Sequence, residues 1–128
     1  MAKSWIHAQS SARKFGGKPE DYLPIHNHMD ATKGAFADNR HRAITHNAWY
    51  IGPGGPLELA LGVVLTNSAG REVPVRSIAE QHILEDFGGF IPTLQDFLCA
   101  MEYQPWMNGQ GQPPSRTNTL QPVSTVGD

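Results

Sequence analysis

The chain has 128 residues, of which 39% are hydrophobic and 17% are charged, and its formal net charge is −2. This length corresponds to one domain with enough residues to bury an apolar core. The charge balance excludes a polybasic nucleic-acid arm and a highly charged disordered chain, so nucleic acid is not an expected partner.

Cysteine content and hydropathy exclude further classes of protein. The single cysteine, Cys99, excludes an intramolecular disulfide framework and a multi-cysteine zinc knuckle. The longest apolar stretch, Leu57 to Leu65, is far shorter than the ~20 residues of a membrane span. The first residues carry no apolar signal segment. We therefore expect a cytoplasmic protein without membrane contact, with Cys99 as a core residue of an apolar helix.

Two amphipathic helices are predicted in the first third of the chain. Apolar residues recur at spacings of three and four after Ser4, an N-cap candidate, and Gly16-Gly17 ends this pattern. A second helix is expected from about Lys18-Pro19, where proline suits the first turn, to Gly34.

The middle of the chain changes from a helical to an extended pattern. A third helix is predicted over 37–51, capped by Asp38 or Asn39, with Ile44 on its apolar stripe. The Gly-Pro-rich run 52–56 ends it, and residues 57–61 form another turn or two of helix. The β-branched runs 63–66 and 72–75 then predict a small hairpin.

Two more helices are predicted before the composition becomes polar. Ser77 and Glu80 form a capping-box pattern ahead of a helix over 78–87, and Gly88-Gly89 ends it. Thr93 caps a final helix over 94–101. We predict a mainly α fold, a compact bundle of four or five short helices with a small inserted β-hairpin. Residues 1–106 form the domain, and 107–128 form a polar Pro/Gly-rich tail that is disordered or ordered by a partner.

Six histidines against four lysines are the most informative feature of the composition. Several histidines have a carboxylate three or four residues away, which places both groups on one face of a helix. Facing helices can combine such pairs into a metal site, and imidazole with carboxylate suits zinc, manganese or iron. The predicted divalent transition metal ligands are His26, Asp30, His46, His82 and Asp86.

The remaining histidines have simpler interpretations. His41 and His46 lie ~140° apart on a helix, so one of them points elsewhere, and the sequence leaves open which one. His28 is expected to face solvent, because it lies two residues from His26 and therefore on another face. For His7, hydrogen bonding to a backbone carbonyl and a functional role are both open.

Catalytic groups beside the metal are assigned from residue type. Glu85 is a candidate general base, and Arg42 is a candidate clamp on developing negative charge. Arginines bind phosphate in a bidentate manner, so a small anionic substrate, a nucleotide or another phosphoester, is the expected class. The simpler alternative pairs Arg42 with Asp38 one helical turn earlier.

The order of several short motifs resembles a family of small uncharacterised proteins of phages and bacteria, over nearly all of Trp5 to Trp106. The motifs are Phe15-Gly16-Gly17, Glu20-Asp21-Tyr22, Ile25-His26, Arg40-His41-Arg42-Ala43 with His46, and Glu80-Gln81-His82-x-x-Glu85-Asp86. The family has no established activity, so the resemblance implies an intracellular, phage-type setting and no particular reaction.

Three functional hypotheses follow. The first is a metal-dependent hydrolase that acts on a nucleotide or another phosphoester. The second is a non-catalytic phage-type binding or inhibitor protein with a structural metal or none. In the third, the histidines are scattered polar residues on the surface of a homo-oligomer, whose subunits are joined by the C-terminal tail.

Overall fold

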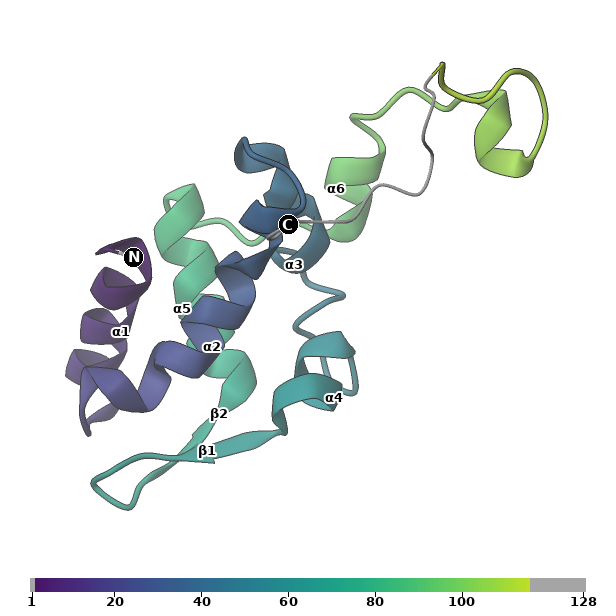
Figure 1. Cartoon of the computed structure of the whole chain (residues 1–128). Helices are drawn as coiled ribbons and strands as arrows, with labels where there is room; N and C mark the ends of the chain where they lie inside the picture. Colours follow the sequence, from purple (N-terminus) through teal and green to yellow (C-terminus); the bar gives the residue numbers. More distant parts are fainter. Residues whose placement is uncertain (1, 116–128) are drawn as a thin grey trace.

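The computed structural model describes residues 2–115 and has the predicted mainly helical architecture with one hairpin (Figure 1). Its helices, 3-10 turns (η) and strands follow one another as α1 (Ala2–Phe15), η1 (Pro19–Tyr22), α2 (Leu23–Asp30), η2 (Ala31–Gly34), η3 (Asn39–His41), α3 (Arg42–Thr45), α4 (Pro56–Leu61), β1 (Val64–Thr66), β2 (Glu72–Pro74), α5 (Val75–Phe87), α6 (Leu94–Leu98) and η4 (Pro105–Asn108). Within these residues, no helix combines the length and the apolar character needed to cross a bilayer.

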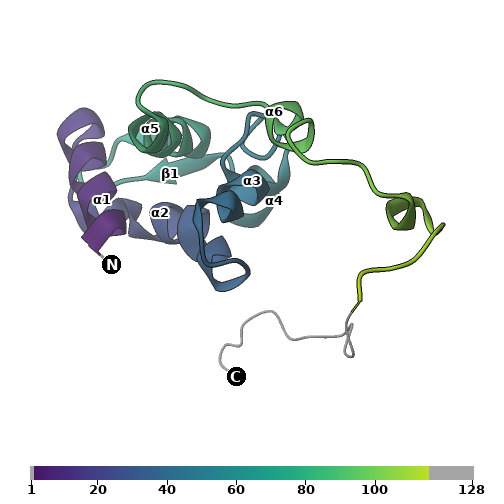
Figure 2. The same cartoon turned by 90° about the horizontal axis from the view of Figure 1, so that it is seen from above.

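Helices α1, α2 and α5 lie side by side and enclose most of the core (Figures 1 and 2). The buried apolar side chains come from these helices, from η1, from α4, from β2 and from the loop before α4. They are Ala8, Phe15, Tyr22, Ile25, Met29, Ile51, Leu57, Val73, Val75, Ile78, Ala79 and Ile83. Burying each large member contributes about 1.5–3 kcal/mol, so this cluster fixes the mutual positions of the three helices.

The hairpin leads directly into α5. Strands β1 and β2 pair antiparallel, with Leu65 opposite Val73, as the β-branched runs predict. The backbone N–H of Val75 donates to the carbonyl of Val63, so one residue closes the hairpin and begins the helix. Helix α5 therefore starts three residues earlier than predicted, with Pro74 at the N-cap, and the prediction that Ser77 caps it is wrong. Its predicted end is confirmed, because Gly88 has φ +70°.

The predicted helix over 37–51 is wrong beyond Thr45. Only Asn39 to Thr45 are helical, first as a 3-10 turn and then as α3. The buried Asn47 explains the stop, because its side-chain amide donates to the carbonyl of Ala43 and its oxygen accepts from the N–H of Tyr50. An asparagine that bonds local backbone groups in this way competes with continued helix. The rest of the segment forms turns.

Two residues predicted for the core are exposed. Ile44 is 49% exposed, because the short α3 turns it away from the bundle. Cys99 is also exposed, since α6 ends at Leu98 and not at Met101. The N-terminal cap of α6 is as predicted: Thr93 and Asp96 form a reciprocal capping box.

Residues 99–109, which follow α6, run away from the helical body (Figure 2). Residues 116–128 of the predicted polar tail lie outside the described residues. At the other end of the chain, α1 begins at Ala2, so Ser4 lies inside the helix and not at its predicted cap. Its hydroxyl donates to Asp30 Oδ2 at 3.2 Å, which joins α1 to the end of α2.

Candidate metal centre

One group of side chains within residues 2–115 has the composition and spacing of a metal site. Asp30, His46, His82 and Asp86 each offer one ligand atom, and these four atoms lie within 4.8 Å of one another. Asp30 ends α2, His46 follows α3, and the other two lie four residues apart on α5. The crossing of α2 and α5 therefore brings together groups far apart in sequence, all with buried or nearly buried side chains.

The two histidine nitrogens of this group lie close to the two carboxylate oxygens. His82 Nε2 lies 3.2 Å from Asp30 Oδ1 and 3.1 Å from Asp86 Oδ2. His46 Nε2 lies 3.0 Å from the same Asp86 oxygen and 3.9 Å from Asp30 Oδ1. The two imidazoles and the two carboxylates thus point at a common centre between the helices.

The hydrogen bond on the outer nitrogen of His46 fixes how this ring is protonated. Its Nδ1 lies 2.9 Å from the Thr45 hydroxyl oxygen, and that hydroxyl donates its hydrogen to the carbonyl of Met29 at 2.8 Å. The hydroxyl oxygen therefore accepts from His46 Nδ1–H. In a neutral ring, Nε2 is left with a lone pair that points into the centre.

A longer chain of hydrogen bonds fixes His82 in the same way. Its Nδ1 lies 2.9 Å from His26 Nδ1, and His26 Nε2 lies 2.8 Å from the Ser11 hydroxyl oxygen. That hydroxyl faces two acceptors, the Gln81 side-chain oxygen and the His7 carbonyl, so its hydrogen goes to one of them. Ser11 then accepts from His26 Nε2–H, and His26 Nδ1 accepts from His82 Nδ1–H. The Nε2 lone pair of a neutral His82 also points inward.

Two inward lone pairs and two carboxylate oxygens at about 3 Å repel one another unless a positive charge lies among them. A proton on a ring nitrogen supplies that charge in part, and a divalent ion bound by all four groups supplies it fully. Outer hydrogen bonds on both ligand histidines are the usual support of a metal site. The four groups could therefore hold a metal ion.

Titration behaviour shows how the centre balances charge without an ion. Burial opposes the charge on His82, but its hydrogen bonds to Asp30 and Asp86 outweigh burial and raise its pKa. Burial would raise the pKa of both carboxyls, yet hydrogen bonds from histidine lower that of Asp30 to about 2 and that of Asp86 further still. Burial lowers the pKa of His46. Of the two imidazoles, His82 is therefore the one whose protonated form the carboxylates favour.

The layer behind the centre stays neutral. Burial, followed by the nearby charges of His82 and His7, lowers the pKa of His26 to about 3. A neutral His26 can accept the hydrogen bond from His82, which the protonated form cannot. His26, predicted as a ligand, is thus placed one step behind the group, where it orients His82.

The second oxygen of Asp86 faces a cationic rim. Lys3 Nζ and His7 Nε2 each lie 3.1 Å from Asp86 Oδ1, and Arg42 Nη2 lies 3.7 Å from it. One carboxylate thus connects the centre, through Oδ2, with two permanent positive charges, through Oδ1. This rim is the part of the site to which an anion would be attracted.

A cavity of about 550 Å³ between α1 and α5 opens onto the rim and is lined by Lys3, Ile6, His7, Ser10, Glu85 and Asp86. Glu85, the predicted general base, does not face the four-residue group. Its Oε1 lies 2.7 Å from His7 Nδ1, at the wall of the cavity. Asp86 is the residue that the cavity and the four-residue group share, so the cavity borders the group at this carboxylate.

The other predicted polar residues have separate partners. Arg42 contacts Asp86, whereas Asp38 pairs with Arg40, so the simpler pairing of Arg42 with Asp38 does not form. His41 is buried against Thr32 at 2.8 Å. His28 is half-buried and lies 2.9 Å from the Tyr50 hydroxyl, so the expectation that it faces solvent is wrong.

The structure also places His7 in the site, a residue that the sequence left open. His7 lies on the buried face of α1 with Ser4 and Ser11, at spacings of three and four. Small polar residues and a histidine on the same face as Ala8 and Phe15 are a signal that could have identified it, because buried polar groups must find partners in the fold.

The chain belongs to a protein family described as a domain of unknown function, DUF6915, which it matches over residues 2–107. The match agrees with the resemblance seen between Trp5 and Trp106 to a family without an established activity. No curated protein and no solved structure shows significant similarity to the chain.

Proposed function

We propose that the protein is a metal-dependent hydrolase in which Asp30, His46, His82 and Asp86 hold one divalent transition metal ion: zinc, manganese or iron. The inward direction of both Nε2 lone pairs, set by the hydrogen bonds on the outer ring nitrogens, carries the proposal. A bound ion of this kind lowers the pKa of water toward ~7 and polarises the bond to be hydrolysed.

The cationic rim supports an anionic substrate, a nucleotide or another phosphoester. Arg42 is almost buried, its Nε has no hydrogen-bond partner among the described residues, and its Nη2 is too far from Asp86 for a hydrogen bond. Its guanidinium therefore keeps donors for a phosphoryl oxygen, which it can bind in a bidentate manner. Lys3 adds a second positive charge at the mouth of the cavity.

The pair formed by Glu85 and His7 supports proton transfer beside the rim. Both residues line the cavity, and Glu85 holds His7 Nδ1 so that His7 Nε2 faces Asp86. A carboxylate within hydrogen-bond reach of a water molecule can act as a general base. Both ring nitrogens of His7 lie against carboxylates, so in this proposal Glu85, which is partly exposed at the cavity wall, accepts the proton and His7 holds its Oε1 in place.

A second function is favoured by the number of protein ligands. Four protein groups complete the tetrahedral shell that zinc adopts at structural sites, whereas catalytic zinc keeps one position open. Manganese or iron, which accept about six ligands, would leave positions open in the same cage. In this second function all four groups bind zinc with no position left for water, and the protein is a non-catalytic binding protein with a structural metal.

Metal titration followed by a phosphoester screen tests both functions. We expect the metal-free protein to bind one equivalent of zinc, manganese or iron, and His46→Ala to lose that binding. His28→Ala is the matched control, because this histidine lies outside the group. Hydrolysis with manganese or iron supports the hydrolase, whereas zinc-dependent stability without turnover under any metal supports the structural role. No metal binding by the wild-type protein overturns both.

A further inference from the structure

The C-terminal part of the chain carries a feature that is independent of the metal centre. Residues 99–109, which we name the arm, continue from α6 and run away from the helical body (Figure 2). Large apolar side chains on the arm are exposed: Met101 by 54%, Tyr103 by 66%, and Trp106 and Met107 by 40% each. A folded chain rarely exposes several such side chains within so short a segment unless they bind something.

The end of the arm is ordered before it binds anything. Residues Pro105–Asn108 form the 3-10 turn η4, with Pro105 at its first position and Gly109 in the left-handed conformation at its end. Hydrogen bonds within the turn, such as Gly109 N–H to the Trp106 carbonyl, fix the backbone that carries the two large side chains. Because this segment is already fixed, binding through it costs little conformational entropy.

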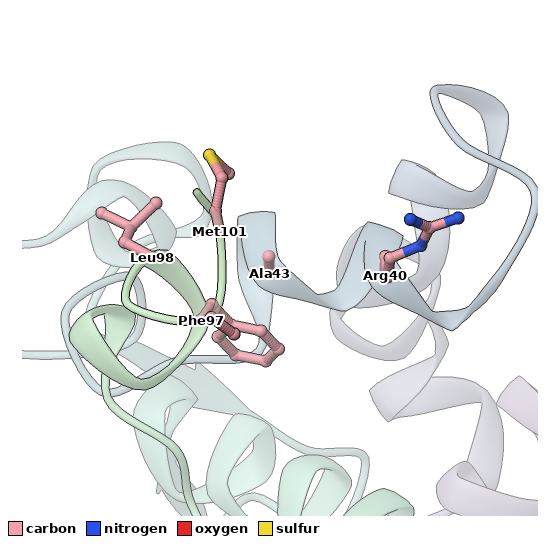
Figure 3. Close-up of a pocket in the computed structure, with 6 residues that line it drawn as sticks. Arg40, Ala43, Phe97, Leu98 and Met101 are labelled. Carbon is pink, nitrogen blue, oxygen red and sulfur yellow. The ribbon is translucent and has the colours of Figure 1, made fainter. Parts of the chain in front are cut away.

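A complementary pocket lies at the base of the arm. Between α3 and α6, a mainly apolar pocket of about 320 Å³ is lined by Arg40, Ala43, Phe97, Leu98, Ala100 and Met101 (Figure 3). Figure 3 shows Ala43 on one wall facing Phe97, Leu98 and Met101 on the other, with Arg40 at the edge. Arg40 is already paired with Asp38, so the pocket offers mainly apolar contacts to an incoming side chain.

We propose that two copies of this chain exchange their arms, with Trp106 and Met107 of each copy inserted into the pocket between α3 and α6 of the other. The arm leaves its own body beside this pocket, so one two-fold axis brings both exits next to both pockets. The family match extends to residue 107 and therefore includes both inserted side chains in the domain. A second copy supplies the required partner without any other protein.

Sedimentation velocity on the full-length chain tests the exchange, and it needs no metal. We expect the wild-type chain to have twice the 14.0 kDa mass of a single copy over a dilution series. The arm variant Trp106→Ser with Met107→Ser, and the pocket variant Leu98→Glu, should each weaken the dimer by at least about a hundredfold, because both insertions are lost at once. Leu98 is half-exposed, so this substitution leaves the core intact.

Two controls make the result specific. Trp49→Ser removes another exposed aromatic residue, outside the arm and the pocket, and should leave the dimer unchanged. Mixing the arm variant with the pocket variant should restore a dimer, because one intact arm can enter one intact pocket. A monomeric wild-type chain overturns the proposal. It is also overturned if the arm variant and the pocket variant each dimerise as strongly as the wild type. The far-UV circular dichroism of each variant reports whether it is folded.

Discussion

Two regions of the molecule are unusual in opposite ways. The centre between α2 and α5 buries charged groups, whereas the surface around α6 and the arm exposes apolar ones. At the centre, two carboxylates and two imidazoles are nearly or fully buried. Around α6, leucine, methionine, tyrosine and tryptophan side chains are exposed. Charged groups are rarely buried without partners, and large apolar groups are rarely exposed in clusters. Each region therefore has the character of a binding site: the first could hold a cation, and the second is the surface for which we propose a second copy of the chain.

His82→Ala is expected to have the largest effect, a loss of metal affinity at the centre with no change in the association of the arm. This histidine touches both carboxylates, so we expect metal affinity to fall by at least about a thousandfold, or about 4 kcal/mol. Isothermal titration of the metal-free protein measures it. Because the arm lies elsewhere, the sedimentation of the variant should match that of the wild type. Unchanged metal affinity would show that the ion, if any, binds outside this group.

Acid should destabilise the metal-free protein, by up to a few kcal/mol. The folded pKa of His26, about 3, lies below the unfolded value of 6.5, so folding favours the neutral ring. That contribution is fully present above pH 6.5 and is lost as the pH falls toward 3. Asp30 adds a loss between pH 3.8 and about 2. His82, with its raised pKa, acts in the opposite sense, since its contribution is lost as the pH rises above 6.5.

Urea unfolding at a series of pH values checks this prediction. His26→Asn is the matched variant, because its side chain can still accept from His82 but does not titrate. Its unfolding free energy should change less between pH 6.5 and 3 than that of the wild type. An equal slope in both proteins would show that His26 is not the group responsible.

A smaller effect is expected from the groups behind the centre. Ser11→Ala removes the acceptor that holds His26 Nε2–H and should weaken metal binding by about 10–100-fold, as is typical of outer hydrogen bonds at metal sites. Gln9→Ala, at an exposed position of the same helix outside the cavity, is the control and should bind like the wild type. A loss equal to that of His82→Ala would mean that Ser11 acts through folding.

The smallest effect concerns the position of α6, on which the pocket depends. Thr93→Ala removes a capping bond and should cost about 1 kcal/mol of unfolding free energy. Ser77→Ala should change it by less than about 0.5 kcal/mol, because Ser77 does not cap α5. Thermal unfolding compares the two. If Ser77→Ala lowered the unfolding free energy more than Thr93→Ala, Ser77 would cap α5 as the sequence predicts.

The sequence by itself determined the elements whose signals are local. The hairpin, the end of α5 at Gly88 and the Thr93 cap each depend on a few neighbouring residues. Helical spacing likewise placed His82 and Asp86 on one face of α5. The predicted helix over 37–51 was too long because its apolar spacing continues past Thr45. The Asn47 side chain bonds nearby backbone groups there and ends the helix.

The tertiary structure alone decided how these pieces form a centre. Asp30 and His82 are 52 residues apart and meet because α2 crosses α5 above a shared apolar core. That packing also selected His46 over His41, placed His26 behind His82 and brought His7 to the rim. The sequence supplied a surplus of candidate ligands, and only the packing of the helices could choose among them, because the direction of a side chain depends on contacts distant in sequence.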